Sequence, residues 1–434
     1  MKIMFVSEHA SPLAALGGVD AGGQNVHVAE LAKALVGLGH QVSVVTRRDD
    51  PDLPPDLLTA DGYRVVHLSA GPARPVAKDE LWPHMTTFSD GLRDRLRSDR
   101  QDLVHAHFWM SGWAARRAAT AVGLPTVVTF HALGAVKRRH QGLDDTSPNE
   151  RVAIEADLAT SVQRIVATCT DEVTELADLT PTPALTSVVP CGVDVTRFAP
   201  TGPVRGGRRH PYRIVALGRL VPRKGFATVI EALPRLPGTE LVLAGGTAGP
   251  EPERDRLLDV ATACGVESRV HLVPQVPRAE VPALLRSADV VVTTPWYEPF
   301  GIVPLEAMAC GRPVVASAVG GMLDTVVPGD TGLLVPPRDP AALAAALRHL
   351  LSRPDLRRAY GRHGVERART HYSWTSVAQR TVRAYGLTLT RHLRLTGTAA
   401  AAPTRAGLAE ADRTGAALTG TDLAEAGLTG AGRS

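Results

Sequence analysis

The sequence predicts two doubly wound α/β domains in tandem. Short apolar runs alternate with helical patterns along most of the 434 residues. The runs are continuous rather than alternating with polar residues, which is typical of parallel strands that helices cover on both faces. A stretch rich in Pro, Gly and Arg, at 200–211, interrupts the pattern before it restarts. A chain of this length suits roughly two to three domains.

The first half contains a series of predicted strands separated by helical patterns. The strands are expected at Ile3–Ser7, Val42–Thr46, Tyr63–Leu68, Leu103–Phe108, Thr126–His131, Arg164–Thr170 and Ser187–Pro190. The helices are expected near Gln24–Leu38, Leu81–Arg97, Gly112–Ala121, Glu150–Ser161 and Asp171–Ala177. We therefore assign residues 1–199 to a first domain.

The second half repeats this arrangement after the interruption. Its strands are expected at Tyr212–Arg219, Glu240–Ala244, Val270–Val273, Val290–Thr294, Pro313–Ala316 and Gly332–Val335. We assign 200–211 to an interdomain linker and 212–372 to a second domain. Residues 373–394 are expected to form one more helix. The remaining 395–434 are rich in Ala, Gly and Thr and lack aromatic residues, so we expect a disordered tail.

The composition excludes several classes of function. The formal net charge of +4 is small for this length and does not argue for nucleic-acid binding. The four cysteines show no CxxC spacing, which disfavours a zinc site or a disulfide framework. No apolar run of about 18 residues is present, so no membrane span is expected. The chain starts with a short strand rather than a signal peptide, and we expect a cytoplasmic protein.

The most informative segment is EPFGIVPLE, which carries the carboxylates of Glu298 and Glu306. The predicted strand Val290–Thr294 leads into the first carboxylate, and the second lies one turn into the following helix. Open α/β sheets bind ligands at the carboxyl ends of their strands. Carboxylates there, beside a helix N-terminus, suit a ligand with hydroxyls and phosphates, such as a sugar nucleotide. The alternative is a solvated loop Glu and an exposed helical Glu.

Two further loops have the chemistry to bind phosphate. Gly22 and Gly23 open the first predicted helix, where free N–H groups and the absence of side chains permit a ligand to approach closely. A flexible surface loop is the alternative. Arg219 and Lys224 lie at the first strand-to-helix turn of the second domain, and two cations there suit a diphosphate. Ordinary surface charges are the alternative for this pair.

Histidines and basic residues add weaker signals. His131 ends a predicted strand that faces the interdomain cleft, so it suits orienting substrate hydroxyls or moving a proton, or else a structural role. Packing is the favoured role for His105 and His107. The run Lys137–His140, in a predicted loop, is either solvated or in contact with an acidic acceptor or a membrane surface. No cluster has the spacing of a metal site, so neither a metal nor another cofactor is expected.

Taken together, these segments resemble the retaining glycosyltransferases of family four (glycosyltransferase group 1), which have the GT-B fold. The matching stretches, in the family's order, are GGVDAGGQN, the strand ending in His131, PCGVD, GRLVPRKG and EPFGIVPLEAMACGRPVVA. The resemblance covers about residues 1–390. It implies two Rossmann-like domains that face an interdomain cleft. The first would bind the acceptor and the second the nucleotide sugar.

The resemblance implies roles for the matching cations and for the first domain. Arg219 and Lys224 would hold the donor diphosphate and stabilise the leaving group. His131 would contact the donor sugar. The backbone of Gly22 and Gly23 would approach the phosphate or the sugar. Members of this family work without a metal, and the departing phosphate is thought to help deprotonate the acceptor. Closure of the domains would complete the site.

The second domain would hold the rest of the donor. Glu306 would bind the ribose hydroxyls. Glu298, with the backbone of Phe300, Gly301 and Ile302, would bind the sugar hydroxyls. The nucleobase would lie beside the loop that ends at Val276. The resemblance thus makes Glu298 an expected catalytic residue, together with His131, Arg219 and Lys224, although not as a nucleophile.

Within the family, the chain is similar to the actinobacterial mycothiol-pathway members, which transfer N-acetylglucosamine to an inositol phosphate, and to sucrose-phosphate-synthase-like members. Asn25, Lys78, Phe108 and Arg151 fall where acceptor contacts are implied, with Lys78 and Arg151 at positions that bind the acceptor phosphate. Phe108 and Ala132 stand where those members have Tyr and Thr, so two phosphate-binding hydroxyls are absent. We therefore expect another small soluble acceptor, a metabolite or a natural product.

Three other functions stay open. A peripheral membrane mannosyl-, heptosyl- or other hexosyltransferase acting on a lipid-linked acceptor would use the basic run for weak contact with a membrane surface. A sugar-nucleotide epimerase of the same fold is a second alternative. A non-catalytic sugar-nucleotide binder is the third. The donor nucleotide is open between UDP, GDP and ADP.

Overall fold

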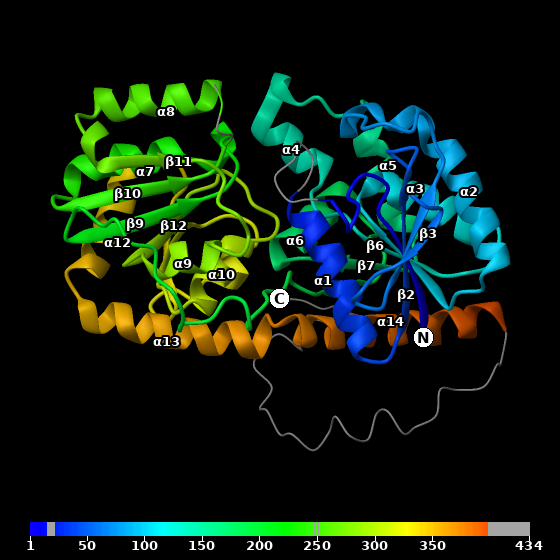
Figure 1. Ribbon diagram of the computed structural model, residues 1–434. Helices are drawn as coiled ribbons and strands as arrows, with labels where there is room; N and C mark the ends of the chain where they lie inside the picture. Colours follow the sequence, from blue (N-terminus) through cyan, green and yellow to red (C-terminus); the bar gives the residue numbers. More distant parts are fainter. Residues whose placement is uncertain (15–21, 247–248, 250, 398–434) are drawn as a thin grey trace, which may run out of the picture. The chain divides into compact units, whose positions relative to one another are not determined.

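The computed structural model describes residues 1–14, 22–246, 249 and 251–397 (Figure 1). The GGVDA part of the first glycine loop and nearly all of the predicted tail lie outside these residues. Residues Met1–His392 form one compact unit that holds both sheets. The prediction of two doubly wound α/β sheets is confirmed, and each strand expected from the sequence is present.

The first sheet has eight strands in the order β3-β4-β2-β1-β5-β6-β7-β8. The strands are β1 (Lys2–Val6), β2 (Gln41–Arg47), β3 (Asp56–Leu58), β4 (Arg64–Leu68), β5 (Leu103–His107), β6 (Thr126–Thr129), β7 (Arg164–Ala167) and β8 (Thr186–Val188). All pairings are parallel except that of β3, which runs antiparallel to β4 at the edge. The sequence did not predict β3, because this short edge strand has exposed leucines and no buried apolar run.

The helices of the first half cover both faces of this sheet (Figure 1). They are α1 (Gly23–Gly37), α2 (Met85–Ser98), α3 (Trp109–Thr120), α4 (Gly134–Gln141), α5 (Arg151–Ser161) and α6 (Thr170–Leu179). The prediction of a loop around Lys137–His140 is wrong, because this segment belongs to α4. Lys, Arg and Gln are good helix formers, and a helix made mostly of them shows no apolar periodicity.

The second sheet has six parallel strands in the order β11-β10-β9-β12-β13-β14. The strands are β9 (Tyr212–Leu217), β10 (Thr239–Ala244), β11 (Val270–Val273), β12 (Val290–Thr293), β13 (Val314–Ser317) and β14 (Gly332–Val335). The helices are α7 (Phe226–Ala232), α8 (Pro252–Ala263), α9 (Val281–Arg286), α10 (Ile302–Ala309), α11 (Met322–Thr325), α12 (Pro340–Leu351) and α13 (Pro354–His371). The strand order reverses between β9 and β12, and the carboxyl ends of the strands at such a reversal are where open α/β sheets bind ligands.

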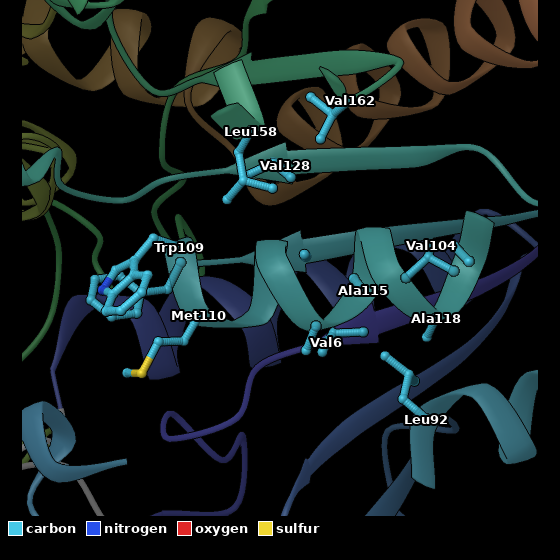
Figure 2. Packing of buried hydrophobic residues seen from close by; sticks show 14 of the residues in the cluster. Val6, Leu92, Val104, Trp109, Met110, Ala115, Ala118, Val128, Leu158 and Val162 are labelled. Carbon is cyan, nitrogen blue, oxygen red and sulfur yellow. The ribbon is translucent and has the colours of Figure 1, made fainter. Parts of the chain in front are cut away.

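Apolar side chains are buried on both faces of each sheet. Figure 2 shows one of these clusters, in which α3 packs against the first sheet. Gly112 permits the close packing there, because a Cβ at this position would lie 2.9 Å from Cδ1 of Leu158. The clusters fix the carboxyl ends of the strands, where the predicted ligand residues lie.

The last described helix, α14 (Trp374–Thr396), contacts residues of the first sheet. The hydroxyl of Tyr385 lies 2.7 Å from Nδ1 of His105, and Nε of Arg164 donates to Thr388 at 3.0 Å. The segment predicted as a linker lies against α9. There, Arg286 donates hydrogen bonds to the carbonyl groups of Ala199 and Pro203 at 2.9 Å each.

Candidate active site

The loop between β12 and α10 holds the two carboxylates singled out in the sequence. Gly301, with a φ of 70°, ends this loop at the first turn of α10. The carbonyl of Glu298 accepts a hydrogen bond from the N–H of Gly321 at 2.9 Å. A Cβ at Gly320 would lie 2.3 Å from the same carbonyl oxygen. The glycines after β13 therefore fix the backbone of Glu298.

The side chain of Glu298 is ion-paired with Lys224. Lys224 follows β9 and Glu298 follows β12, so the pair lies where the strand order reverses. Burial raises the pKa of Glu298, but the charges of Lys224, Arg223 and Arg219 outweigh it and the net pKa is lowered. Burial lowers the pKa of Lys224, which Glu298 opposes. Glu298 is therefore ionised at neutral pH.

Gly225 permits close contact between the loop that follows β9 and the loop that follows β12. Its φ is 68°, and a Cβ there would lie 1.9 Å from the carbonyl oxygen of Thr294. The hydroxyl of Thr294 donates to the carbonyl of Gly225 at 2.9 Å, and the N–H of Trp296 donates to the carbonyl of Arg223 at 2.8 Å. The loop that carries Lys224 and the loop that carries Glu298 are thus held against each other by backbone contacts. Arg219, just after β9, is exposed and adds its charge to the pair.

Glu306 lies inside α10, is 1% exposed and is ion-paired with Arg278. Burial raises the pKa of Glu306, and Arg278 opposes this shift. Arg278 was missed in the sequence. The feature that could have indicated it is its position two residues after Val276, beside the loop expected to contact the nucleobase. Val276 itself is buried, and the guanidinium of Arg278 lies 4.7 Å from the ring centroid of Phe198.

His131 lies beyond the end of β6 rather than in the strand, which is a correction to the sequence prediction. Its φ of 63° is unusual for a residue with a side chain. Its Nε2 lies 2.9 Å from Nδ1 of His107, and its ring lies 5.1 Å from the ring of Phe300. Its Nδ1 has no hydrogen-bond partner among the described residues. Strained backbone of this kind clusters at functional sites.

Four imidazoles form a cluster here, those of His131 and of its neighbours His27, His105 and His107. All are buried, and His107 also stacks on His131 with ring centroids 5.1 Å apart. Burial lowers the pKa of each, to about 4 for His27 and to about 3 for His105. The cluster is therefore neutral at pH 7. Packing, the role favoured for His105 and His107, agrees with their burial, but the sequence did not indicate their hydrogen bonds.

Gly23 of the first glycine loop faces the EPFGI segment, whereas a Cβ at Gly22 would meet no atom within 4 Å. A Cβ at Gly23 would lie 3.3 Å from Cδ1 of Ile302 and 3.7 Å from Cδ2 of Phe300. Asn25 closes the start of α1. Its Oδ1 accepts from the N–H of Gly22 at 2.9 Å, and its Nδ2 donates to the carbonyl of Ser11 at 2.9 Å. The Asn25 side chain is thus engaged in the helix cap rather than turned toward a ligand.

Three of the predicted acceptor residues lie together. Lys78 and Arg151 place their charged groups 5.7 and 5.0 Å from the ring centroid of Phe108. Phe108 directly follows β5 and has a φ of 87°, so the strand predicted to include it is one residue shorter. Arg151 is 2% exposed and bonded within the protein. It donates to Glu155 at 2.8 Å, to Ser147 at 3.1 Å and to the carbonyl of Ala132 at 2.6 Å.

The basic residues of α4 are also paired. Lys137 contacts Asp145 and Ser147 at 2.9 Å each, and Arg139 contacts Glu175 at 2.6 Å. These contacts reduce the positive charge that the run offers to a membrane surface. Among residues 1–14, 22–246, 249 and 251–397, no helix is long and apolar enough to cross a membrane. Within the same part, no group of three or more His, Cys, Asp or Glu side chains is arranged to hold a metal ion.

Comparison with known proteins gives matches along most of the chain. Residues 205–367 match the family described as glycosyl transferases group 1, and residues 21–197 match glycosyltransferase family 4. The chain is 37% identical over 413 residues to a D-inositol 3-phosphate glycosyltransferase of Kineococcus radiotolerans, covering 88% of this chain and 94% of that protein. It is 36% identical over 400 residues to the protein of the same name in Acidothermus cellulolyticus, covering 87% and 88%.

Solved structures agree with this result. A sucrose-phosphate synthase from Thermosynechococcus elongatus matches with a TM-score of 0.81 and 30% identity, over 90% of this chain and 99% of that one. An Anabaena protein solved in complex with UDP and glucose matches with a TM-score of 0.68 and 21% identity, a likeness of fold alone. The family resemblance read from the motifs is confirmed. The chain belongs to the group 1, family 4 glycosyltransferases and is an enzyme with the GT-B fold.

Proposed function

We propose that this enzyme moves a sugar from a nucleoside-diphosphate sugar to a small soluble acceptor, with retention of the anomeric configuration and without a metal. The observation that carries the proposal is the meeting of Lys224 and Glu298 at the carboxyl ends of β9 and β12. A crevice at such a reversal of strand order is where open α/β sheets bind nucleotides. A cation suited to phosphate and a carboxylate suited to hydroxyls lie side by side there.

In this proposal the second domain holds the donor. Arg219 and Lys224 bind the diphosphate and stabilise the charge that develops on the leaving group. Glu306 accepts hydrogen bonds from the ribose hydroxyls, which requires Arg278 to share or release this carboxylate. Glu298 binds hydroxyls of the transferred sugar. Arg219 and Lys224 supply the positive charge that a metal ion supplies in other transferases.

Retention follows if the acceptor attacks from the side of the leaving group. The bond between the anomeric carbon and the phosphate oxygen breaks, the acceptor oxygen bonds to the same face, and the acceptor proton passes to the departing phosphate. The ion pair of Glu298 with Lys224 supports a binding role for this carboxylate rather than a nucleophilic one. Burial lowers the pKa of His131, so this imidazole acts as a neutral hydrogen-bonding group.

The acceptor site is proposed on the first domain, beside His131. The curated relatives are named D-inositol 3-phosphate glycosyltransferases, so this cyclitol phosphate is the first acceptor to test. Lys78 and Arg151 supply positive charge beside Phe108. However, Arg151 already donates three hydrogen bonds within the protein, and an acceptor phosphate would have to compete for it.

The first test is binding of UDP, GDP and ADP to the full chain by calorimetry with EDTA present. We expect one nucleotide to bind best. Its sugar derivatives are then assayed with acceptors for release of nucleoside diphosphate, and the product anomer is determined by NMR. Lys224→Ala and Glu306→Ala should each lower turnover by about a hundredfold, the size typical of a lost charge-stabilising group.

Arg256→Ala is the matched control, because Arg256 pairs with Glu253 on α8, away from the proposed donor residues. Its turnover should equal that of the unmodified enzyme. Unchanged turnover in both Lys224→Ala and Glu306→Ala would overturn the assignment of the donor site. Conversion of the sugar nucleotide without any acceptor would indicate an epimerase instead.

A further inference from the structure

A cavity of about 290 Å³ lies beside the candidate donor site. Its walls come from segments that follow β6 and β7 of the first sheet and β12, β13 and β14 of the second, together with helices α4 and α6. It therefore lies at the edge where open α/β sheets bind their ligands. Its size suits a single small ring compound or part of a larger one.

One wall of this cavity is acidic, and we call it the acidic cavity. Asp171, Glu172 and Glu175 of α6 line it, and Arg139 pairs with Glu175. Glu172 is 7% exposed, and its Oε2 accepts hydrogen bonds from the N–H and the hydroxyl of Thr168 at 2.7 Å each. Its Oε1 has no hydrogen-bond partner among the residues that the structure describes. Among the described residues, neither Asp171 nor Glu172 forms an ion pair within 4 Å, although the charge of Arg139 partly offsets the rise that burial causes in the pKa of Asp171.

The other lining groups do not offset this charge. His140 is the one base among the described lining residues, and its ring stacks on Tyr297 with centroids 4.9 Å apart. Burial, with Arg139 beside it, lowers the pKa of His140, which is therefore neutral at pH 7. Burial raises the pKa of Glu172, and burial with Glu175 nearby raises that of Asp171. A cation placed between these carboxylates would relieve their repulsion.

The opposite walls are apolar. They are formed by Leu133, Val136, Trp296, Val319, Leu323 and Pro337. Apolar walls with a few polar groups at one end are typical of sites that orient a small molecule. This arrangement fits a compact carbon ring that carries a positive charge at one end.

The acidic cavity adjoins the proposed reaction site. Glu298, the proposed ligand of the donor sugar, lines it, and Ala132, which follows His131, also lines it. The cation on the far side of Ala132 is Arg151, which donates to the carbonyl of Ala132 at 2.6 Å. Arg151 is also bonded to Glu155 and Ser147, so its charge is neutralised within the protein. The described residues that line the cavity include carboxylates but no Lys or Arg, although Arg338 packs on the ring of the lining residue Trp296.

We propose that the acidic cavity binds the acceptor and that this acceptor is a polyol carrying a primary ammonium group. The proposal rests on the transferase function proposed above. The ammonium group donates to Asp171 and Glu172, the ring packs against Leu133 and Val136, and a hydroxyl lies beside Glu298. In the transfer, that hydroxyl oxygen bonds to the anomeric carbon, the bond from this carbon to the phosphate breaks, and the hydroxyl proton leaves on the phosphate.

The test compares three probes that differ at one position of the same ring. Myo-inositol, D-inositol 3-phosphate and an amino-inositol are titrated by calorimetry into the full chain saturated with the nucleoside diphosphate that binds best. The amino-inositol should bind at least about tenfold more tightly than the other two, as expected for a charge-assisted hydrogen bond. Asp171→Asn and Glu172→Gln should each weaken its binding by about tenfold. Asp171 is partly exposed, so its variant remains informative if Glu172→Gln fails to fold.

Asp178→Asn is the matched control, because Asp178 lies on the same helix but is exposed and does not line the cavity. It should leave amino-inositol binding unchanged. Tighter binding of D-inositol 3-phosphate, or equal binding of all three probes, would overturn the proposal. Nucleotide binding in the same samples separates the two questions. If nucleotides bind but the amine gives no advantage, only the acceptor assignment fails, whereas loss of nucleotide binding would count against the transferase function itself.

Discussion

His107 is buried at the end of β5, and its Nδ1 lies 2.9 Å from Nε2 of His131. His131 is held at a φ of 63° and stacks on His107, so the orientation of its ring depends on this neighbour. If His131 contacts the donor sugar, as proposed, His107 is a positioning residue: it touches no substrate but sets which nitrogen of His131 faces the cleft. A small misplacement of such a group lowers the rate without weakening donor binding.

We therefore expect His107→Ala to lower kcat by about tenfold, the equivalent of one lost hydrogen bond. Its nucleotide dissociation constant should stay unchanged, because no donor residue on the second domain is altered. His107→Asn, whose amide nitrogen can take the place of Nδ1, should recover most of the rate. Equal losses of kcat in the two variants, or a parallel loss of nucleotide affinity, would mean that His107 acts only through the fold. Steady-state kinetics and calorimetry on the same preparations give both quantities.

At the scale of elements, α14 is attached to the first sheet by a chain of hydrogen bonds. The hydroxyl of Thr129 donates to the carbonyl of Val166 at 3.0 Å, so its oxygen must accept from Nε2 of His105 at 2.9 Å. Nδ1 of His105 then carries no proton and accepts from the hydroxyl of Tyr385 at 2.7 Å. All these groups are buried, and only one assignment of donors and acceptors satisfies every hydrogen bond in the chain.

Tyr385→Phe would leave Nδ1 of His105 buried without a donor. We expect the free energy of unfolding to fall by about 1–3 kcal/mol, the cost of an unsatisfied buried acceptor. Urea unfolding at pH 7.5 measures this. Leu387→Ala, on the exposed side of the same helix, should change the free energy by less than about 0.5 kcal/mol. An equally small effect of Tyr385→Phe would show that apolar packing alone holds α14.

The elements were largely predictable because each buried parallel strand leaves a continuous apolar run in the sequence. The failures have physical reasons. The edge strand β3 has no buried run, and α4 is a helix of basic residues whose charges are neutralised by Asp145 and Glu175. Nothing local in the sequence signals these pairings. Strand ends were predicted too long at His131 and Phe108, because the backbone turns to positive φ only where the tertiary structure requires it.

At the scale of the whole molecule, the candidate site could be assembled only in part. Placing Lys224 near Glu298 follows from the rule that ligands bind at the carboxyl ends of strands. The pairing of Glu306 with Arg278 could not be predicted, because Arg278 lies in a loop whose conformation the sequence does not specify. The acidic cavity was also unforeseen. It combines α4 and α6 with loops that follow strands of both sheets, and no single segment of the sequence signals such a combination.

The buried histidines make the stability of the whole molecule depend on pH. In the fold, the pKa of His27 is about 4 and that of His105 about 3, both below the ordinary value of 6.5. Below pH 6.5 the unfolded chain takes up protons that the folded chain does not, so stability falls as pH falls toward the folded pKa. Each histidine contributes about 1.4 kcal/mol per pH unit in that window. The raised pKa values of Glu172 and Glu306 act in the opposite direction, which partly offsets the loss.

A single substitution isolates the histidine contribution. Nδ1 of His27 has no hydrogen-bond partner among the described residues, so His27→Leu removes a titrating group without orphaning another. Near pH 7.5 we expect the two proteins to differ by less than about 1.5 kcal/mol. Between pH 6.5 and pH 5 the free energy of unfolding of the variant should rise by about 2 kcal/mol relative to that of the unmodified protein, because the unfolded variant lacks this protonation site. Urea unfolding at pH 7.5, 6 and 5 provides the comparison. Parallel pH profiles for the two proteins would show that His27 is not held neutral by the fold.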